Sequence, residues 1–504
     1  MKKLGGIVLE SWSDEAIADI AEGLSASQDL LVPSPETLSK KLEGWIGRPL
    51  TEGDLVALAD VILIHYDVEG YPVVGLEVPD QDFRDGKLHL LAEIGRIGRV
   101  GVSRPKYGDV DSLRDGLWLR GGDLLRRRDL DEQLSWFGRS IFRNPRLFVS
   151  PGEEPATADI LIAMEERKPW RVTMGYENSG PDVLGRDRFL FGAVGMTKSE
   201  QLIAWQSVFG APVSSLQAHA LHWEIPFHRL HQSLILDAGY AEVSSLGLSP
   251  NGFGGFTLVD NDGTSWSLAA GQRFHFSAPS GWRQHLTAGM EVKGTDQFVL
   301  FGAVRVAPGE VRLVHAKVAY DLSKTWDDGG ATLNASLIAS PGGLINGNDD
   351  ADFQAYDPQA DSNYRIARVS GSGWWSPGGD WRLLARGSGQ WADSRLLPAE
   401  QFAVGGAQTV RGASEREFFA DNGWQASFEA YTPSWMPVDN CQMRFLGFFD
   451  CAWIKNRGRS SRSLSSTGLG IRMNVTEHFN LRADHGWRLD DSENQSHVGF
   501  TVTF

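Results

Sequence analysis

Cysteine is nearly absent from this chain, and so are long apolar runs. Cys441 and Cys451 are the only cysteines among 504 residues, and both fall on one predicted strand. At that spacing they lie roughly 30 Å apart, which is beyond the reach of a disulfide and predicts no metal site. No run approaches the roughly 18 consecutive apolar residues of a membrane helix. Spanning strands are not excluded, because each needs only about 9 to 11 alternating residues.

Basic charge and a targeting leader are also lacking. The formal net charge of -16 argues against nucleic-acid binding, which requires a basic surface. Leu4 to Leu9 is too short an apolar core for a secretory signal before Glu10, so we expect a signal peptide to be absent from this chain, removed or lost through a misplaced start. The chain also lacks a Ser-His-Asp set, a phosphate-binding glycine loop and paired carboxylates. We therefore predict no enzyme and no cofactor.

Glycine and tryptophan are abundant: 57 Gly and 18 Trp favour many short strands over a helical bundle. After Pro169 the chain consists of alternating segments of about ten residues, separated by Gly, Asp, Asn and Pro. Sixteen such segments begin near Trp170, Arg188, Gln201, Leu216, Ser233, Ser265, Trp282, Val311, Gly330, Tyr364, Trp381, Trp424, Met443, Ser465, Asn480 and His497. An even number of antiparallel strands brings both ends of a sheet to the same side.

The final segment alternates most regularly. One face carries Val498, Phe500, Val502 and Phe504, and the other carries His497, Gly499, Thr501 and Thr503. A soluble sandwich would bury the apolar face and expose the polar one to water. A membrane barrel presents the apolar face to lipid and the polar face to its lumen. We favour the barrel, because the two preceding segments also keep their polar residues on one face, and we expect a wet lumen.

A long glycine-punctuated segment, about residues 394–423, carries Arg411 at its tip, the single arginine of the stretch 402–412. Long loops of this kind are functional or disordered, and we interpret this one as an ordered functional loop. Asp450 lies on the polar face of a strand whose other face is apolar, so a loop folded into the lumen would place Arg411 within reach of it. Glu429, which shares the lumen side with Gln425 and Ser427, is a candidate third partner.

This ion pair has two interpretations. It could be a structural salt bridge that only fixes the loop. Alternatively Arg411, Gly412, Asp450 and Glu429 form a lock between the loop and the barrel wall, which sets whether the pore is plugged or passable. A removable contact is reasonable in a wet lumen, because charged groups pair there at modest cost.

Residues 1 to about 168 differ in kind, and they contain one pattern twice: strand, helix, helix, strand, strand. In the first copy we predict strands in 4–9, 73–78 and 88–94. Two helices lie between the first and second of these strands. One runs from Ser34 to Gly47 and includes Trp45 and Ile46, and the other is capped by Thr51 and Asp54. The second copy is predicted as a strand in 99–103, a helix in 110–119, a helix capped by Asp129 with Leu130, Leu134, Phe137 and Ile141 on one stripe, and strands in 147–150 and 159–165.

An exposed sheet edge can accept an extended peptide as an added strand. The edge residues that we expect to bind a partner are Val73, Val74, Leu76 and Val78 in the first copy and Leu147, Phe148 and Val149 in the second. The alternative for these modules, half of an α+β enzyme, lacks a catalytic constellation.

Val410-Arg411-Gly412 on a long loop, paired with the aromatic-x-Asp-x-small strand around Asp450, resembles a known superfamily. Its outer-membrane secretion and assembly proteins join periplasmic POTRA modules to a 16-stranded barrel. Within it, the chain is most similar to the TpsB transporters of two-partner secretion, of the haemolysin secretion/activation type. It departs from the pattern at Ala413, where an aromatic usually follows the Arg-Gly, and at Ala452, where a glycine usually follows the Asp.

This resemblance implies a transmembrane β-barrel of 16 antiparallel strands preceded by two small α+β POTRA modules. The modules would occupy residues 1–97 and 98–168 in the periplasm, and the barrel residues 169–504 in the outer membrane. The modules would catch a secreted, TpsA-like partner exoprotein for export, and the terminal Phe504 would engage the barrel-assembly machinery. The alternatives are a factor that inserts other outer-membrane proteins, which would be expected to carry more modules, and a passive porin, which would need none.

Two clusters contain residue types that bind metals, but we predict no metal site at either. His219 and His222 fall on opposite faces of a strand, so the group His219, His222, Glu224, His228 and His231 cannot converge on one ion without a bend. The aspartates between Asn346 and Asp361 do not have the spacing of a calcium loop.

Overall fold

The computed structural model describes residues 3–12, 16–81, 86–250, 256–278, 281–301, 304–305 and 310–504. The chain divides into two compact units, and each is considered by itself. The first is Met1–Arg167, and the second is Lys168–Phe504 apart from Ser277–Pro279. Among the described residues, no helix combines the length and the apolar character that a membrane crossing requires.

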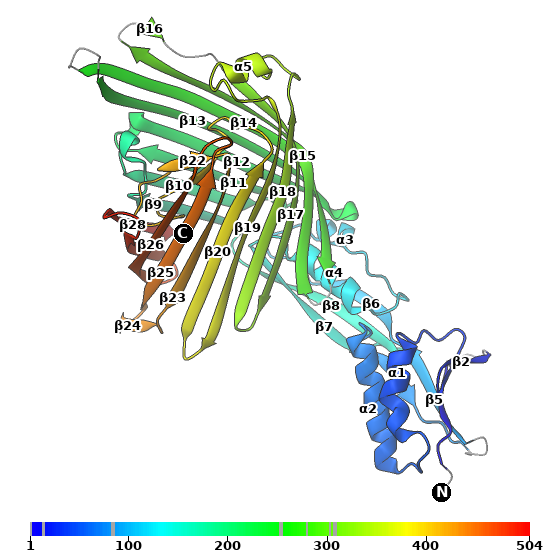
Figure 1. The fold of residues 1–504 in the computed structure, drawn as a ribbon. Helices are drawn as coiled ribbons and strands as arrows, with labels where there is room; N and C mark the ends of the chain where they lie inside the picture. Colours follow the sequence, from blue (N-terminus) through cyan, green and yellow to red (C-terminus); the bar gives the residue numbers. More distant parts are fainter. Residues whose placement is uncertain are drawn as a thin grey trace. The chain divides into compact units, whose positions relative to one another are not determined.

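The first unit begins with a five-stranded sheet in the order β2-β3-β1-β5-β4. Its strands are β1 (Gly6–Glu10), β2 (Ile17–Ala21), β3 (Leu24–Ser27), β4 (Val74–Glu77) and β5 (Lys87–Ile94). The central β1 runs parallel to both β3 and β5, and these parallel connections require crossovers. The crossover to β4 contains the helices α1 (Pro35–Leu42) and α2 (Glu52–Val68), with the 3-10 turn η1 (Glu43–Trp45) between them (Figure 1).

The capping box predicted at the start of α2 is confirmed. The Asp54 amide donates to Thr51 Oγ1 at 3.2 Å, and the Thr51 amide donates to Asp54 Oδ2 at 2.9 Å. The first helix is shorter than predicted, because α1 ends at Leu42 and the next three residues form η1. Leu38, Leu58 and other apolar residues of the two helices pack with β1 and β5 in one core.

The sequence prediction missed β2 and β3. Their signal was Gly23, whose positive φ of 71° forms the tight turn between two four- or five-residue strands. Short acidic and small-residue strands of this kind carry little hydrophobic periodicity. Leu24 and Ala26 are nevertheless buried against β1.

The second sheet, in the order β6-β8-β7, repeats the pattern with fewer strands. Its elements are β6 (Arg96–Val102), α3 (Val110–Asp115), α4 (Arg127–Phe137), β7 (Arg143–Pro151) and β8 (Thr157–Glu166). Only Gly95 separates β5 from β6, and a Cβ there would lie 2.7 Å from the Val73 side chain, so glycine permits this junction.

Three details of the second copy are corrected. The helix after residue 109 ends at Asp115, because Gly116 caps it there. Arg126 rather than Asp129 is the N-cap of α4, so Asp129 lies inside the first turn. Ile141 lies beyond the end of α4 and is exposed, whereas Leu130 and Phe137 of the predicted stripe are buried.

The second unit is a closed antiparallel barrel. Sixteen strands of the described residues form its ring, and the two short pieces β16 (Val304–Arg305) and β24 (Trp435–Val438) extend two of its hairpins. The ring strands are β9 (Trp170–Glu177), β10 (Arg188–Met196), β11 (Leu202–Gly210), β12 (Leu216–Phe227), β13 (Gln232–Pro250), β14 (Phe256–Ala278), β15 (Trp282–Phe301), β17 (Val311–Trp326), β18 (Gly329–Pro341), β19 (Asn363–Gly378), β20 (Trp381–Ala392), β23 (Asn422–Tyr431), β25 (Cys441–Lys455), β26 (Ser461–Val475), β27 (Phe479–Arg488) and β28 (Asn494–Thr503).

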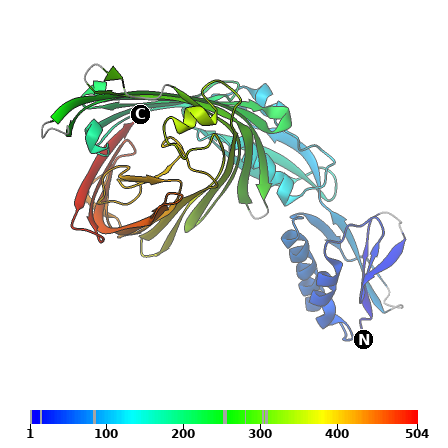
Figure 2. The same cartoon turned by 45° about the horizontal axis from the view of Figure 1, so that its top comes forward.

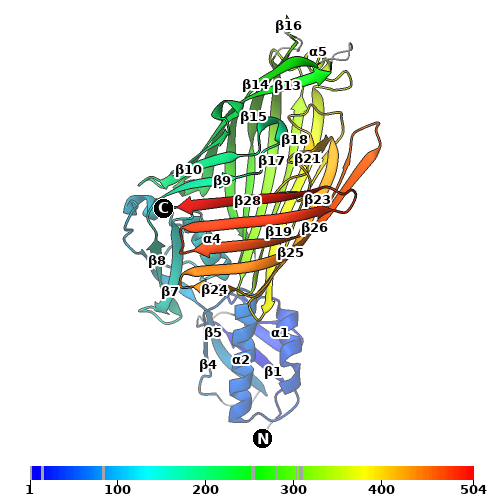
Figure 3. The ribbon, with the colours of Figure 1, turned by 90° about the vertical axis from the view of Figure 1, so that its left-hand side faces the viewer.

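Pairing of β28 with β9 closes the ring (Figure 3). Each of the sixteen predicted segments falls on one of these strands. The largest difference is β14, which begins at Phe256 rather than near Ser265. Asn261, Asp262 and Gly263 have the composition of a turn, but their backbones pair with β13 and so continue the strand.

Connections between the ring strands contain the remaining elements of the barrel unit. They are the 3-10 turns η2 (Asp182–Leu184), η3 (Val213–Ser215) and η4 (His228–Leu230), the helix α5 (Asp350–Gln354), and the small hairpin of β21 (Phe402–Val404) and β22 (Phe418–Ala420). The hairpin belongs to the predicted long loop between β20 and β23. Figure 2 shows this segment inside the ring of strands.

A loop locked inside the barrel

The tip of the long loop packs on the wall formed by β25 and β26. Val404, Val410, Ala413 and Ala420 from the loop form one apolar cluster with Ala452, Ile454 and Leu464 from the wall. Both departures from the family motif, Ala413 and Ala452, are buried in this cluster. Compared with the family motif, the loop residue Ala413 is therefore smaller and the wall residue Ala452 is larger.

Arg411 and Asp450 meet in a bidentate ion pair. Arg411 Nε and Nη2 donate to the two carboxylate oxygens of Asp450, each at 2.7 Å, and the Arg411 amide donates to the same carboxylate at 3.1 Å. Two parallel N–H···O bonds fix orientation as well as distance. The backbone bond also ties the position of the loop to Asp450.

Further charges surround this pair. Glu429 on β23 lies 2.8 Å from Arg411 Nη1, and Asp484 on β27 lies 3.8 Å from the same atom. Arg386 and Arg472 approach Glu429 and Asp484 at 3.5 and 2.8 Å. Three guanidinium groups thus face three carboxylates. The remaining side of Arg411 stacks on Phe448, with 3.5 Å between the guanidinium carbon and the ring centroid.

The expectation of a wet lumen is wrong at this wall. Arg411 and Asp450 are both 0% exposed. Beside Asp450, the inner face of β25 carries buried apolar residues, including Leu446 and Phe448, and Phe448 lies against the Arg411 guanidinium. The ion pair is therefore desolvated, and removing one partner would leave an uncompensated buried charge.

Glycines make room for the loop tip. Gly412 has a φ of 99°, and a Cβ there would lie 2.9 Å from the Gly486 carbonyl oxygen on β27. In the other direction, a Cβ on Gly486 would lie 2.6 Å from the carbonyl carbon of Arg411. The two backbones are in direct contact, and a side chain at Gly486 would lift the tip. A Cβ on Gly468 would likewise reach the Phe448 ring, at 2.2 Å.

A second group of charges holds the base of the loop, and the sequence prediction missed it. Glu400, 1% exposed, pairs with Lys293 of β15 at 2.9 Å and with Arg368 of β19 at 2.8 Å. Gln390 of β20 donates to the Glu400 backbone carbonyl at 2.8 Å. We call Glu400, Lys293 and Arg368 the base clamp. Its signal in the sequence was weak, because Lys293 and Arg368 lie far from the loop in the chain.

Two family models match the chain. The model described as haemolysin secretion/activation protein ShlB/FhaC/HecB matches residues 261–473, and the model of the ShlB-type POTRA domain matches residues 30–93. The first match contains the loop and Asp450, and the second lies within the first sheet. The chain belongs to the TpsB family of haemolysin secretion/activation proteins.

Curated relatives of this family agree along the chain. The heme/hemopexin transporter protein HuxB of Haemophilus influenzae is 21% identical over 493 residues, which is 92% of this chain and 82% of HuxB. The outer membrane transporter CdiB-2 of Burkholderia pseudomallei is 28% identical over 170 residues, which is 34% of this chain and 28% of that relative. The predicted family is confirmed, and so is the predicted class of function, an outer-membrane secretion transporter.

Solved structures of the family have the same fold. CdiB from Escherichia coli has a TM-score of 0.80 at 16% identity, over 99% of this chain and 90% of that one. CdiB from Acinetobacter baumannii has a TM-score of 0.73 at 14% identity, over 100% of this chain and 90% of that one. The predicted fold class, a barrel of 16 strands after POTRA-like sheets, is confirmed.

The predicted partner-binding segments of this TpsB protein lie on sheet edges. β4 is the edge strand of the first sheet and β7 of the second. Phe148 and Val149 on β7 are 55% and 47% exposed, and Val78 just after β4 is exposed too. Val73, by contrast, packs partly buried against the core of the second module, and so does Leu147.

The clusters that had invited a metal site do not converge. His222 Nδ1 lies 2.6 Å from Asp237, whereas His219 Nδ1 lies 2.6 Å from Ser207, so the two histidines have different neighbours. In the acidic segment, Asp349 caps α5 and Asp350 accepts from the Ser362 amide at 2.8 Å. No group of three or more His, Cys, Asp or Glu within the described ranges could hold a metal ion.

Proposed function

We propose that this chain is the outer-membrane translocation pore of a two-partner secretion system, which recognises and exports one large partner exoprotein. The observation that carries the proposal is a long loop inside a closed barrel, fixed to its wall by a buried ion pair, in a chain that also has a POTRA-type module. The matched family and its relatives named as transporters support it. Because the chain has no recognisable nucleotide site, folding of the partner outside the cell drives the transfer.

The barrel spans the outer membrane, and the POTRA modules lie in the periplasm. The apolar outer positions of the strands, such as Phe449, Leu469 and Phe500, support this placement because they are well exposed on the isolated chain. The terminal Phe504 is also exposed, and its backbone pairs with Val172 at 2.9 Å. It is the signal by which the barrel-assembly machinery recognises the chain.

The modules bind the partner as an added strand. Edge β7 suits this better than β4, because Phe148 and Val149 are exposed beside its free backbone groups, whereas Val73 is engaged in a core. Deleting residues 1–95 removes the first module and leaves β7 in place. We therefore expect partner binding in a pull-down to persist and the barrel to remain heat-modifiable on a gel. Lost binding would place the docking surface on the first module instead.

A neighbouring gene for a long, repeat-rich exoprotein would identify the partner, and export itself is tested by expressing the chain together with that exoprotein. We expect the exoprotein in the culture supernatant only when this chain is present. A factor that inserts other barrels would instead change the amounts of other outer-membrane proteins. A passive porin would show a conductance that is insensitive to removal of the modules. Either result, without secretion, would overturn the proposal.

A further inference from the structure

An apolar groove of ≈ 900 Å³ crosses neighbouring strands of the barrel, from β18 to β26. Two rows of paired residues border it. One row runs from Ala331 on β18 to Thr467 on β26, and the other runs from Gly329 to Leu469 on the same two strands. Its volume falls within the range of about 300–1,000 Å³ that small-molecule sites occupy. The groove is therefore large enough for a ligand.

The groove lies on the outer face of the barrel. Phe428 and Phe449, which border it, are 54% and 43% exposed, whereas the side chains of Glu429 and Phe448 point into the lumen and are buried. Glu429 and Phe448 also line the groove, and the alternation of a strand lets them reach its outer side only through their backbones. Inside the lumen, Arg411 contacts both of these side chains, and it does not line the groove. The groove thus faces the lipid.

Small residues make the outer surface hollow here. Gly373 and Ala385 are paired on one side of the groove, and Ala430 and Gly447 are paired on the other. A Cβ on Gly447 would meet nothing within 4 Å, so the space above it is free of protein. Larger exposed side chains border the same hollow, namely Trp375, Leu383, Phe428, Phe449 and Leu469.

The two bordering rows continue to a cation on β17. The register adds Lys324 to the first row, beside Ala331, and Trp326 to the second, beside Gly329. The Lys324 ammonium lies 5.8 Å from the centroid of the Trp282 ring. Tryptophan is enriched at membrane interfaces, and lysine side chains there extend toward the lipid headgroups. A positive charge between two indoles therefore suits a lipid phosphate.

The groove also slopes from one edge of the membrane into its interior. The turns at Asp327 and Glu477 lie at the end of the barrel where β9 begins, and this end faces the periplasm in the proposed placement. Lys324 comes three residues before Asp327, whereas Thr467 comes ten residues before Glu477. An amphiphile with its headgroup at Lys324 would therefore direct its apolar chain along the groove toward the middle of the bilayer.

We propose that the groove binds one acyl chain of an anionic phospholipid from the periplasmic leaflet, with the lipid phosphate at Lys324. Such a lipid is anionic at one end and apolar along its length, which matches the order of groups along the groove. The inference rests on the proposed placement of the barrel in the outer membrane. The bound lipid would cover the outer side of the wall whose inner side, at Glu429 and Phe448, holds Arg411.

Lipid retention by the purified full chain tests the groove. We expect native mass spectrometry of the wild type, incubated in detergent with phosphatidylglycerol, to show one retained lipid. Ala385→Leu fills the middle of the groove and should reduce this retention about fivefold or more. Ala426→Leu is the matched control, because Ala426 alternates with Ser427 to the outer face of β23 and does not line the groove. Its retention should lie within about twofold of the wild type.

The charge of the headgroup tests the role of Lys324. Phosphatidylethanolamine carries no net charge, and the wild type should retain about fivefold less of it than of phosphatidylglycerol. Lys324→Gln should abolish this preference and leave retention of phosphatidylethanolamine unchanged, because the groove stays open. Lys198→Gln, in an exposed turn between β10 and β11, is the control and should keep the preference. Heat-modifiability on a gel verifies that each barrel is assembled.

The outcomes separate the lipid site from the export function. Equal retention by Ala385→Leu and the wild type, or a preference that survives Lys324→Gln, overturns the lipid site. The assay contains no partner, so a chain that retains phospholipid and secretes nothing overturns export alone. A chain that secretes its partner and retains no phospholipid overturns the lipid site alone.

Discussion

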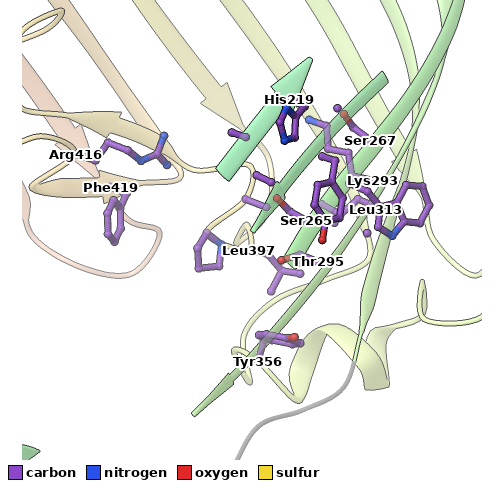
Figure 4. Close-up of a pocket in the computed structure, with 18 residues that line it drawn as sticks. His219, Ser265, Ser267, Lys293, Thr295, Leu313, Tyr356, Leu397, Arg416 and Phe419 are labelled. Carbon is purple, nitrogen blue, oxygen red and sulfur yellow. The ribbon is translucent and has the colours of Figure 1, made fainter. Parts of the chain in front are cut away.

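The two sides of the lumen differ in what they offer a polypeptide. From β20 to β27 the wall presents buried charges, Phe448 and glycines, and the loop tip is packed on it. From β12 to β15 the wall lines a cavity with small side chains such as Ala241 and Ser267, and its one charged lining residue is Lys293 of the base clamp (Figure 4). One wall is built to hold a particular segment of this chain. The other contacts the loop only at its base, through Lys293 and Glu400.

This difference indicates why the loop is held by charges rather than by apolar packing alone. A loop that packed through methyl groups could slide to a neighbouring position at little cost. A bidentate pair that is 0% exposed at both ends allows one position, because any other would leave Arg411 and Asp450 desolvated and unpaired. Charge thus specifies where the loop tip lies.

Replacing Arg411 by alanine should have the largest effect, because it removes the charge that fixes the loop tip to its wall. The change leaves Asp450 buried without its cation, at a cost of about 3–5 kcal/mol to the loop contact. We expect secretion to be abolished while the protein remains in the outer membrane, as measured by partner in the supernatant and barrel in the membrane fraction. Arg411→Lys should rescue only part of the activity, since lysine keeps the charge and loses the fork.

Arg459→Ala is the matched control for that experiment. Arg459 lies in an exposed turn between β25 and β26, so its loss removes the same charge without touching the lumen. Secretion by this variant should equal that of the wild type. Undiminished secretion by Arg411→Ala would reduce the ion pair to a structural feature of the loop.

Replacing Gly486 by alanine should have the next largest effect. The added methyl group would lie 2.6 Å from the Arg411 carbonyl carbon, so the loop tip or β27 must move. Overpacking of this kind costs about 1–3 kcal/mol. We expect protease to reach the loop faster and secretion to fall severalfold. Gly447→Ala is the control, because a Cβ at Gly447 meets nothing within 4 Å, and a shared phenotype would contradict the contact.

Alternation and spacing predicted much of the barrel. Each strand segment was found because period two is visible within about ten residues, and the same periodicity put Asp450 and Glu429 on the lumen face. The pairing of Arg411 with Asp450 rested on the expectation that the loop folds into the lumen, and the family motif supported it. Nothing local to either residue indicates that the chain folds back over 39 positions.

The residues that were missed act through pairs far apart in the chain. Gly486 is one glycine among 57, and only the register of β27 brings it under the loop tip. The turn-like composition of residues 261–263 concealed the start of β14, since pairing with β13 outweighed local preference. The sequence also could not predict that the ion pair of Arg411 and Asp450 is shielded from solvent. This shielding depends on how the loop packs on Phe448, not on the alternation of one strand.

Replacing Glu400 by glutamine should have the smallest effect of the three. Glutamine keeps the size and part of the hydrogen bonding, but Lys293 and Arg368 lose the carboxylate that each now contacts within 3 Å. The loop tip stays fixed by Arg411, so the base alone should loosen. We expect secretion to fall two- to threefold. The loop tip should remain protected from protease, unlike in Gly486→Ala.

Exchanging the charges, with Glu400→Lys and Lys293→Glu together, should restore part of the loss if the clamp acts through its ion pair. Equal loss in the single and exchanged variants would mean that Glu400 matters through packing instead.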